Sequence, residues 1–502
     1  MLIEMSDSLI PVRRPHLELR ERQLFFMLSS RPSAEFDAID EALWESIDGL
    51  RSVGQLRVGC LDADLRLQRL WDLGACELVQ HEFPRARRRV LVLEPHMDDA
   101  ALSVGGLMWA LRNQCEFTLV SIAGYSNFTS YYFLDREYFD VEKISALRKA
   151  ESELVMRLLG GRHTMLNESD TPLRYQPGNW TLDWYRRNRR CVNARLDHCA
   201  SAEEIATCAE AISRVLKETD AEEIWLPLGV GGHADHELSR NACLRALEQH
   251  GGIEQRVSLY FYQDVPYATQ FPDHTGQILD ALRSAGGILV DQRADISGAL
   301  DGKLRLNAIY GSQFKLSYIA PKIEKSARAA SASGTGFSEV LFHVDRLPGP
   351  VEPLALYSGR AAVDALAARL GTWYRRHRLA RRIRILSLVG VGRWAEDMQV
   401  LLEAFPQADF EVYLSAATAG ETERFVSPRI TVRIVEGRSS AWGLSLLGIA
   451  LSKPCPLIVM TGTSRQRLMS LIRVVCFLSN PLSAVTTNYL VLALGVVNAR
   501  RA

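Results

Sequence analysis

VLVLEPHMDDAALSVGG, residues 90–106, joins an apolar run to a cluster of polar side chains and decides the fold class. The branched run Val90–Leu93 predicts a short buried strand, and the proline that follows ends it because proline cannot continue a central ladder. Three groups that bind metals or transfer protons come next: His96, Asp98 and Asp99. Since open α/β sheets bind ligands at the carboxyl ends of their strands, the stretch predicts an α/β fold with a functional site at this edge.

A second polar cluster, Gly232–His236 (GHADH), follows another apolar run, Ile224–Leu226. Two such clusters after two strands predict one shared site. Imidazole and carboxylate groups are the usual ligands of a catalytic zinc, which keeps three protein ligands and leaves a position open for water. His96 and Asp99, with one histidine of the second cluster, supply such a set, and Asp98 remains as a spare carboxylate that can accept a proton. The remaining histidine can stabilise an oxyanion or protonate a leaving group.

The two clusters resemble the motifs of the LmbE/PIG-L family of zinc-dependent N-deacetylases, which read like PHPDDE and HxDH. The resemblance implies a central Rossmann-like domain at residues 88–345 and a Zn²⁺ cofactor. It also implies a metal-dependent amidohydrolase that acts on a linear amide C–N bond. Matched position by position, it makes His96, Asp99 and His236 the zinc ligands.

The same resemblance assigns the catalytic groups. Asp98 becomes the general base, His233 the electrophilic or acid histidine, and Asp235 the carboxylate that orients it. Gly231 stands where some members of the family carry a catalytic tyrosine, so the source of further oxyanion stabilisation stays open. We expect no residues dedicated to any cofactor besides zinc.

Further stretches carry the resemblance beyond the two clusters, although Met97 and Ala100 replace the usual Pro and Glu. The matching stretches are Leu102–Gly106, a helix with Arg148 and Glu151, Tyr260–Tyr267 and Lys303–Gln313. A turn with solvated carboxylates and an ordinary helix N-cap would explain both clusters without a site. The flanking matches favour the enzyme.

The composition limits the classes of protein. At 502 residues, the chain is long enough for about three domains. Its 59 basic and 59 acidic residues balance, so nucleic acid is not an expected partner. Nine cysteines without CxxC pairs and an N-terminus without a signal-peptide core favour a cytoplasmic protein. Cys191, His198 and Cys199 lie close together, but their spacing fits no common metal site.

Residues 1–86 predict a small domain of short helices and strands. Gln23–Leu28 is typical of a strand, and apolar periodicity predicts helices near Phe36–Ile47, from Ser52 onward and over Leu65–Leu73. The pattern is that of a winged-helix-like domain and resembles PqqD-type modules, which bind leader peptides in peptide-modifying systems. A peptide partner and a role in packing or dimerisation both stay open.

The segment from Gly124 to Arg195 is dense in aromatic and arginine side chains. Aromatic faces stack on sugar rings, and arginines bind phosphates or carboxylates, so the segment suits the wall of a carbohydrate site. A hydrophobic lid with a solvated basic face is the other interpretation.

Residues 381–502, after a linker at 346–380, alternate strands with helices. Strands are predicted at 383–389, 410–414, 430–435 and 457–460, and helices at 394–405 and 441–451. The alternation predicts a parallel sheet and faintly resembles the Rossmann-like half of glycosyltransferases, although Gly390–Arg393 lacks the third glycine of a dinucleotide fingerprint. The terminal apolar run Leu490–Val497 is too short to span a bilayer, and we expect it to be buried rather than to contact a membrane.

These patterns lead to one main hypothesis and two alternatives. We expect a zinc-dependent amidohydrolase that removes an acetyl or other acyl group from an N-acylated amino sugar or its glycoconjugate. The first alternative is a zinc hydrolase that acts on an amide of a modified peptide recruited by the N-terminal module. The second is a sugar-nucleotide binding or transfer protein with a structural zinc domain. The spare carboxylate of Asp98 argues against the second, because a structural zinc site needs no base.

Overall fold

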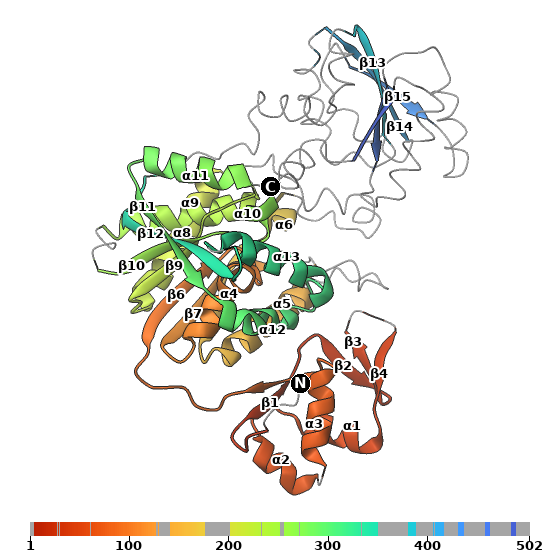
Figure 1. Cartoon of the computed structure of the whole chain (residues 1–502), viewed down its shortest axis with the longest axis vertical. Helices are drawn as coiled ribbons and strands as arrows, with labels where there is room; N and C mark the ends of the chain where they lie inside the picture. Colours follow the sequence, from red (N-terminus) through yellow and green to blue (C-terminus); the bar gives the residue numbers. More distant parts are fainter. Residues whose placement is uncertain are drawn as a thin grey trace. The chain divides into compact units, whose positions relative to one another are not determined.

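The computed structural model of the chain describes most of the N-terminal and central blocks and, beyond them, mainly strands (Figure 1). The described residues are 5–27, 29, 31–60, 62–126, 129, 141–175, 201–231, 233–251, 256–270, 272–332, 334–349, 380–387, 405, 407–415, 430–435, 457–461 and 483–487. The chain divides into two compact units. The first holds the N-terminal and central blocks, and the second holds the C-terminal strands.

A mixed sheet forms the centre of the first unit, with strands in the order β11-β12-β10-β9-β6-β7-β8. Its strands are β6 (Arg88–Glu94), β7 (Cys115–Tyr125), β8 (Arg162–Ser169), β9 (Glu223–Pro227), β10 (Ser258–Tyr262), β11 (Ile288–Asp295) and β12 (Ser338–Arg346). Neighbours from β10 to β8 pair in parallel, whereas β12 pairs antiparallel with β10 and β11. The predicted α/β class is confirmed for this block.

Helices cover both faces of this sheet (Figure 1). They are α4 (Asp99–Leu111), α5 (Val141–Leu158), α6 (Thr171–Tyr175), α8 (Ala202–Glu218), α9 (Ala234–Gln249), α10 (Tyr267–Gln270), α11 (Pro272–Ser284), α12 (Leu300–Ile309) and α13 (Leu316–Ala330), with a 3₁₀ turn at Ser297–Ala299. Val90 and Val92 pack with α4, α5 and α12, whereas Leu91 and Leu93 pack with α8, α9 and α11. Burial on both faces explains why the strand forms an unbroken apolar run. Among the described residues, no helix has the length and apolar character needed to cross a membrane.

The order of the parallel strands reverses between β6 and β9. Val90–Val92 lies opposite Glu223–Trp225 in parallel register. The chain leaves β6 for α4 through the first polar cluster, and it leaves β9 for α9 through the second. Both clusters therefore lie at the edge where doubly wound sheets bind ligands, as the sequence predicted.

The N-terminal block contains the helices and strand expected from its sequence. Strand β1 (Ile10–Arg13) pairs with β5 (Cys76–Val79), and β2 (Leu17–Arg20), β3 (Gln23–Phe26) and β4 (Pro32–Glu35) form an antiparallel sheet. The helices are α1 (Ala38–Ser46), α2 (Val53–Gly59) and α3 (Ala63–Asp72). Asp37 and Ser52 begin the first two helices with a capping box, the reciprocal pair of hydrogen bonds that stabilises a helix N-terminus.

Buried polar contacts hold the N-terminal block against the central block. Glu77 is fully buried and accepts hydrogen bonds from Arg14 and Arg305 at 2.6–3.1 Å. His16 Nδ1 lies 3.0 Å from Glu151 Oε1 on α5, and both side chains are buried. Because an unpaired buried charge is costly, these contacts favour one fixed arrangement of the two blocks.

The C-terminal unit contains a parallel sheet in the order β15-β14-β13-β16-β17. Its strands are β13 (Arg382–Ser387), β14 (Asp409–Ser415), β15 (Ile430–Val435), β16 (Leu457–Thr461) and β17 (Ser483–Thr487). The strands predicted from the sequence and their parallel pairing are therefore confirmed, and β17 is an addition.

Several predictions fall on residues that the structure does not describe. They are nearly all of the helix at 394–405, the helix at 441–451, the glycine turn at 390–393 and the terminal run at 490–497. Most of the linker at 346–380, most of the aromatic segment at 124–195, and Cys191, His198 and Cys199 also lie outside the described residues.

We predict that Glu77→Ala lowers the free energy of unfolding by about 3 kcal/mol, because it leaves two arginines without their buried carboxylate. Urea denaturation measures the change. Asp220→Ala is the control, since it removes an exposed ion pair with Arg89 and should cost less than about 1 kcal/mol. Equal losses in the two variants would contradict the role given to the buried contact.

Candidate active site

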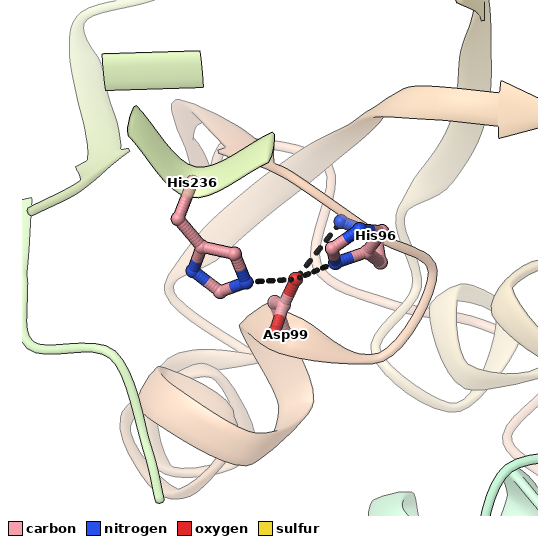
Figure 2. A group of neighbouring side chains, drawn as sticks. All are labelled: His96, Asp99 and His236. Carbon is pink, nitrogen blue, oxygen red and sulfur yellow. Dashed lines mark hydrogen bonds and ion pairs between the residues drawn. The ribbon is translucent and has the colours of Figure 1, made fainter. Parts of the chain in front are cut away.

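The first polar cluster lies in the turn between β6 and α4. Glu94 ends β6, is fully buried, and accepts hydrogen bonds from Ala100 N at 2.9 Å and Ser121 Oγ at 2.6 Å. Asp99 begins α4, and its Oδ2 accepts a hydrogen bond from His96 N at 2.9 Å. These contacts hold the turn so that the imidazole of His96 lies beside the carboxylate of Asp99 (Figure 2).

The second polar cluster lies at the start of α9. His233 is the N-cap residue, and its Nδ1 accepts a hydrogen bond from Asp235 N at 3.2 Å. His236 lies in the first turn, with Nδ1 2.7 Å from Asp264 Oδ1. The other oxygen of Asp264 accepts hydrogen bonds from the backbone N–H groups of residues 229 and 230 at 2.8 and 3.0 Å. Asp264 therefore fixes both the loop before α9 and the orientation of the His236 ring.

The structure brings the predicted metal ligands together (Figure 2). Asp99 Oδ2 lies 3.0 Å from His96 Nδ1 and 3.4 Å from His236 Nε2. The contact with Asp264 indicates that His236 carries its proton on Nδ1, so Nε2 presents a lone pair to a carboxylate. This buried Nε2 atom has no hydrogen-bond partner among the described residues. A lone pair facing a carboxylate oxygen is stabilised by a cation between them, and the two imidazoles and one carboxylate suit a divalent metal.

The charges of the site also favour a cation. Burial disfavours the charged form of His96, yet hydrogen bonds to Asp235 and Asp99 raise its pKa well above the ordinary value. Burial likewise disfavours ionised Asp99, but His236 and His96 hold the pKa of this carboxyl below its ordinary range. The surrounding carboxylates therefore stabilise a positive charge on the largely buried imidazole of His96. A metal ion takes neutral imidazole ligands and displaces that proton.

Asp98 lies apart from this group of ligands. Burial and the neighbouring Asp99 raise the pKa of Asp98 to about 6. Arg148 Nη2 lies 3.7 Å from Asp98 Oδ1, and Arg148 Nη1 donates to Ser126 Oγ at 2.9 Å. The structure thus places a second carboxylate beside the ligands, next to a buried guanidinium.

His233 and Asp235 also reach the site, but their contacts differ from the expected pair. Asp235 Oδ2 lies 2.9 Å from His96 Nε2 and 3.8 Å from His233 Nδ1, so its closer histidine partner is His96. Burial lowers the pKa of His233 to about 3, so its ring is neutral. His96, His233 and Asp235 form a second group whose ligand atoms lie within 4.8 Å of one another.

Sequence patterns did not predict roles for Asp264, Arg174 and Asp170. Arg174 Nη2 lies 2.6 Å from Asp235 Oδ1. Asp170 is buried and accepts a hydrogen bond from Ser126 Oγ, and burial with the nearby Asp235 raises its pKa to about 6. Asp170 and Asp264 follow the carboxyl ends of β8 and β10, so the available signal was a carboxylate shortly after each parallel strand.

Comparison of the sequence with known proteins identifies the class of enzyme. Residues 91–247 match the family model "PIG-L: GlcNAc-PI de-N-acetylase". The chain is 29% identical to 2'-N-acetylparomamine deacetylase of Streptomyces fradiae over 251 aligned residues. The aligned region covers 50% of this chain and 82% of that protein. Residues 91–247 therefore match a deacetylase domain of the PIG-L/LmbE family, a family of metal-dependent amidohydrolases, as the motifs predicted.

Solved structures similar to this chain include a deacetylase of the teicoplanin biosynthesis pathway, with 19% identity and a TM-score of 0.39, over 51% of this chain and 97% of that chain. N,N'-diacetylchitobiose deacetylase from Pyrococcus horikoshii has 18% identity and a TM-score of 0.33, over 51% of this chain and 83% of that chain. Both TM-scores are below 0.5, so the family assignment depends on the sequence matches.

We predict that Asp264→Asn weakens the binding of a divalent metal about 10- to 100-fold, the usual effect of removing a hydrogen-bond partner of a ligand histidine. The amide N–H group of asparagine can donate a hydrogen bond to Nδ1 of His236 and so favour the tautomer with its proton on Nε2. In that tautomer Nε2 has no lone pair for a metal. Competition against a chelating indicator measures the affinity.

Asp345→Asn is the matched control for this experiment. Asp345 Oδ1 also lies 2.7 Å from a histidine Nδ1, that of His343, but this pair is partly exposed and lies on β12. The control should bind metal as the wild type does. Unchanged affinity in Asp264→Asn would mean that His236 is not a ligand.

Proposed function

We propose that this chain is a zinc-dependent N-deacetylase that removes an acetyl group from an N-acetylated amino sugar or its glycoconjugate. One observation carries the proposal. The buried Nε2 of His236, which has no hydrogen-bond partner in the described part of the chain, faces Asp99 and His96. The carboxylate of Asp98 lies beside this group without belonging to it. A metal site with a separate base is the arrangement that hydrolysis of an amide requires.

The comparisons support the substrate class. The matched family is described by the de-N-acetylation of a GlcNAc conjugate, and the curated relative acts on 2'-N-acetylparomamine. Both names describe substrates in which an acetyl group is attached to the nitrogen of an amino sugar. We take an N-acetylated amino sugar as the substrate class of this chain on that basis.

The proposed roles of the metal ligands follow from their contacts. His96, Asp99 and His236 would hold the zinc ion, and Asp264 keeps His236 in the tautomer that binds it. When bound there, the ion supplies a Lewis acid for the amide carbonyl and lowers the pKa of water. Asp235 and the main-chain N–H of His96 keep the remaining ligands oriented through their hydrogen bonds.

Attack on the amide uses Asp98 and His233. Asp98 takes one proton from a water molecule as the water oxygen forms a bond to the carbonyl carbon. The π electrons of the carbonyl move onto its oxygen. His233 Nδ1 accepts a hydrogen bond from Asp235 N, so its proton resides on Nε2, and the neutral ring can donate a hydrogen bond to this oxyanion.

Collapse of the tetrahedral species completes the reaction. The oxyanion re-forms the carbonyl, the C–N bond breaks, and its electron pair leaves with nitrogen. The proton held by Asp98 passes to that nitrogen, so one amide and one water give acetic acid, ionised as acetate, and a free amine. Neutral His233 acts as a hydrogen-bond donor here rather than as the acid.

For the flanking blocks, we propose the folds expected from the sequence. A three-stranded sheet followed by short helices supports a PqqD-type, winged-helix-like module in the N-terminal block. In the C-terminal sheet, the strands lie side by side in the order β15-β14-β13-β16-β17, so the strand that comes first in the chain is central. This order supports a Rossmann-like nucleotide-sugar module.

The function predicts release of acetate from a defined class of compound. We expect purified, zinc-loaded protein to release acetate from 2'-N-acetylparomamine or another N-acetylated amino sugar in a panel that also contains acetylated peptides. Coupled acetate assays and mass spectrometry of the amine measure the products. Release of acetate from peptides alone would favour the peptide hypothesis over the amino-sugar hypothesis. No release from any compound in the panel would contradict the proposed deacetylase activity.

We predict that Asp98→Asn lowers kcat about 10²- to 10⁴-fold, because an amide cannot accept the proton of water. The zinc content should stay at the wild-type value, since Asp98 is not among the proposed ligands. Metal analysis and acetate release measure the two properties on the same preparation. Asp280→Asn, an exposed carboxylate on α11, is the control. Full activity in Asp98→Asn would disprove its role as the base.

A further inference from the structure

The tyrosines near the site differ in what their hydroxyl groups contact. Tyr262 is fully buried and donates to Leu93 O at 2.9 Å, and Tyr310 is fully buried with its hydroxyl 3.3 Å from Ser152 Oγ. Tyr267 is only partly buried, and its hydroxyl makes no hydrogen bond with any residue that the structure describes. Among the described residues, therefore, none accepts the hydrogen bond that the Tyr267 hydroxyl can donate.

The ring of Tyr267 lies against one of the proposed metal ligands. Tyr267 begins α10, and its ring centroid is 5.2 Å from that of His236, with the rings nearly perpendicular at 87°. The backbone N–H of the next residue, Ala268, donates to Asp264 O at 2.9 Å. The segment that carries the tyrosine is thus tied to the same aspartate that orients His236.

Gly231 makes room for this ring. A Cβ atom at residue 231 would lie 2.7–2.9 Å from Cγ, Cδ1 and Cβ of Tyr267, closer than real Cβ contacts allow. Gly231 also has a φ of +103°, which side chains rarely tolerate. Gly231, in the loop before α9, therefore leaves the space that the phenol ring of Tyr267 occupies. Packing between this loop and His236 fixes the direction of the ring.

The ring of Tyr267 carries its hydroxyl beside His236, against which the ring packs. A phenol with a pKa of about 10 or above is neutral at neutral pH and donates one hydrogen bond. The site thus contains a phenol donor on a ring that packs between a proposed ligand, His236, and the backbone of Gly231.

We propose that Tyr267 is a catalytic residue whose hydroxyl donates a hydrogen bond to the oxyanion, alongside Nε2 of His233. The proposal rests on the deacetylation proposed above. As the π electrons of the amide carbonyl move onto oxygen, the phenol strengthens its hydrogen bond to that atom. No proton is transferred, and the bond weakens again when the carbonyl re-forms. Donors placed where charge develops lower the barrier because they need no reorganisation during the reaction.

Tyr267→Phe tests the proposal, because it removes the hydroxyl and keeps the ring beside His236 and Gly231. We expect kcat to fall about 10²-fold, the typical loss of one oxyanion donor, and KM to stay within about twofold. Zinc content and melting temperature should match the wild type. Tyr260→Phe is the control, because the ring of Tyr260 packs on His343, outside the site, and this variant should keep full activity.

A second measurement does not depend on turnover. The probe is N-acetylglucosamine with its acetamide replaced by a methylphosphonamidate, whose tetrahedral oxygens imitate the oxyanion. Calorimetry on zinc-loaded protein should show about 10²-fold weaker binding of this probe to Tyr267→Phe than to the wild type. Tyr260→Phe should bind it as the wild type does.

The possible outcomes distinguish a failure of the role proposed for Tyr267 from a failure of the proposed deacetylation. An active wild type with an equally active Tyr267→Phe, or equal binding of the probe by both, would overturn the role of Tyr267 and leave the deacetylase standing. Loss of zinc from Tyr267→Phe, or a raised KM at unchanged kcat, would show that the ring only supports the site and would also overturn the proposal. A wild type that releases no acetate from any sugar would instead contradict the function, and binding of the probe would still decide the role of the hydroxyl.

Discussion

The parallel pairing of β6 with β9 is the constraint on which the site depends. It places Val90–Val92 beside Glu223–Trp225, so the turns that follow both strands open at one edge of the sheet. His96 and Asp99 come from one turn, and His233 and His236 come from the other. A shift of one residue in this register would move the two turns about 3.3 Å relative to each other, so the polar side chains would no longer meet. The cores on both faces of the sheet fix the register, and thereby the geometry of the site.

Within that frame, the site is stabilised by partners that lie behind the proposed ligands. Asp264 holds the His236 ring, Glu94 holds the turn before α4, and Arg174 holds Asp235. Each is a buried or largely buried polar group, and such a group is stable only when its hydrogen bonds are made. His236 Nε2 is a buried atom without a hydrogen-bond partner among the described residues, and it faces the carboxylate of Asp99 at 3.4 Å. This pair of acceptors leaves a place for a cation between His236 and Asp99.

The local part of this arrangement could be predicted from the sequence. The apolar run at Val90–Leu93 indicates a buried strand, and the residue types after it indicate a metal site at its end. The strands of the C-terminal block were predicted in the same way from their apolar runs. Apolar periodicity also located α1 and α2 in the N-terminal block.

Contacts between distant segments could not be predicted. Asp235 was expected to orient His233, but the turn before α4 brings His96 closer to it. Tyr267 and Gly231 meet through the path of the chain after β10, which no short motif encodes. The N-terminal block likewise packs on α5 through His16 and Glu151, and residue types alone do not reveal such a pair.

The zinc content of the purified protein tests the central claim most directly. Mass spectrometry after dialysis against a weak chelator should find about one zinc ion per chain in the wild type, because a catalytic site keeps three protein ligands for one ion. His236→Ala, which removes the Nε2 nitrogen that faces Asp99, should lose the ion and keep its fold by circular dichroism. A wild type without bound metal, or an equal zinc content in both proteins, would contradict the metal centre on which the account depends.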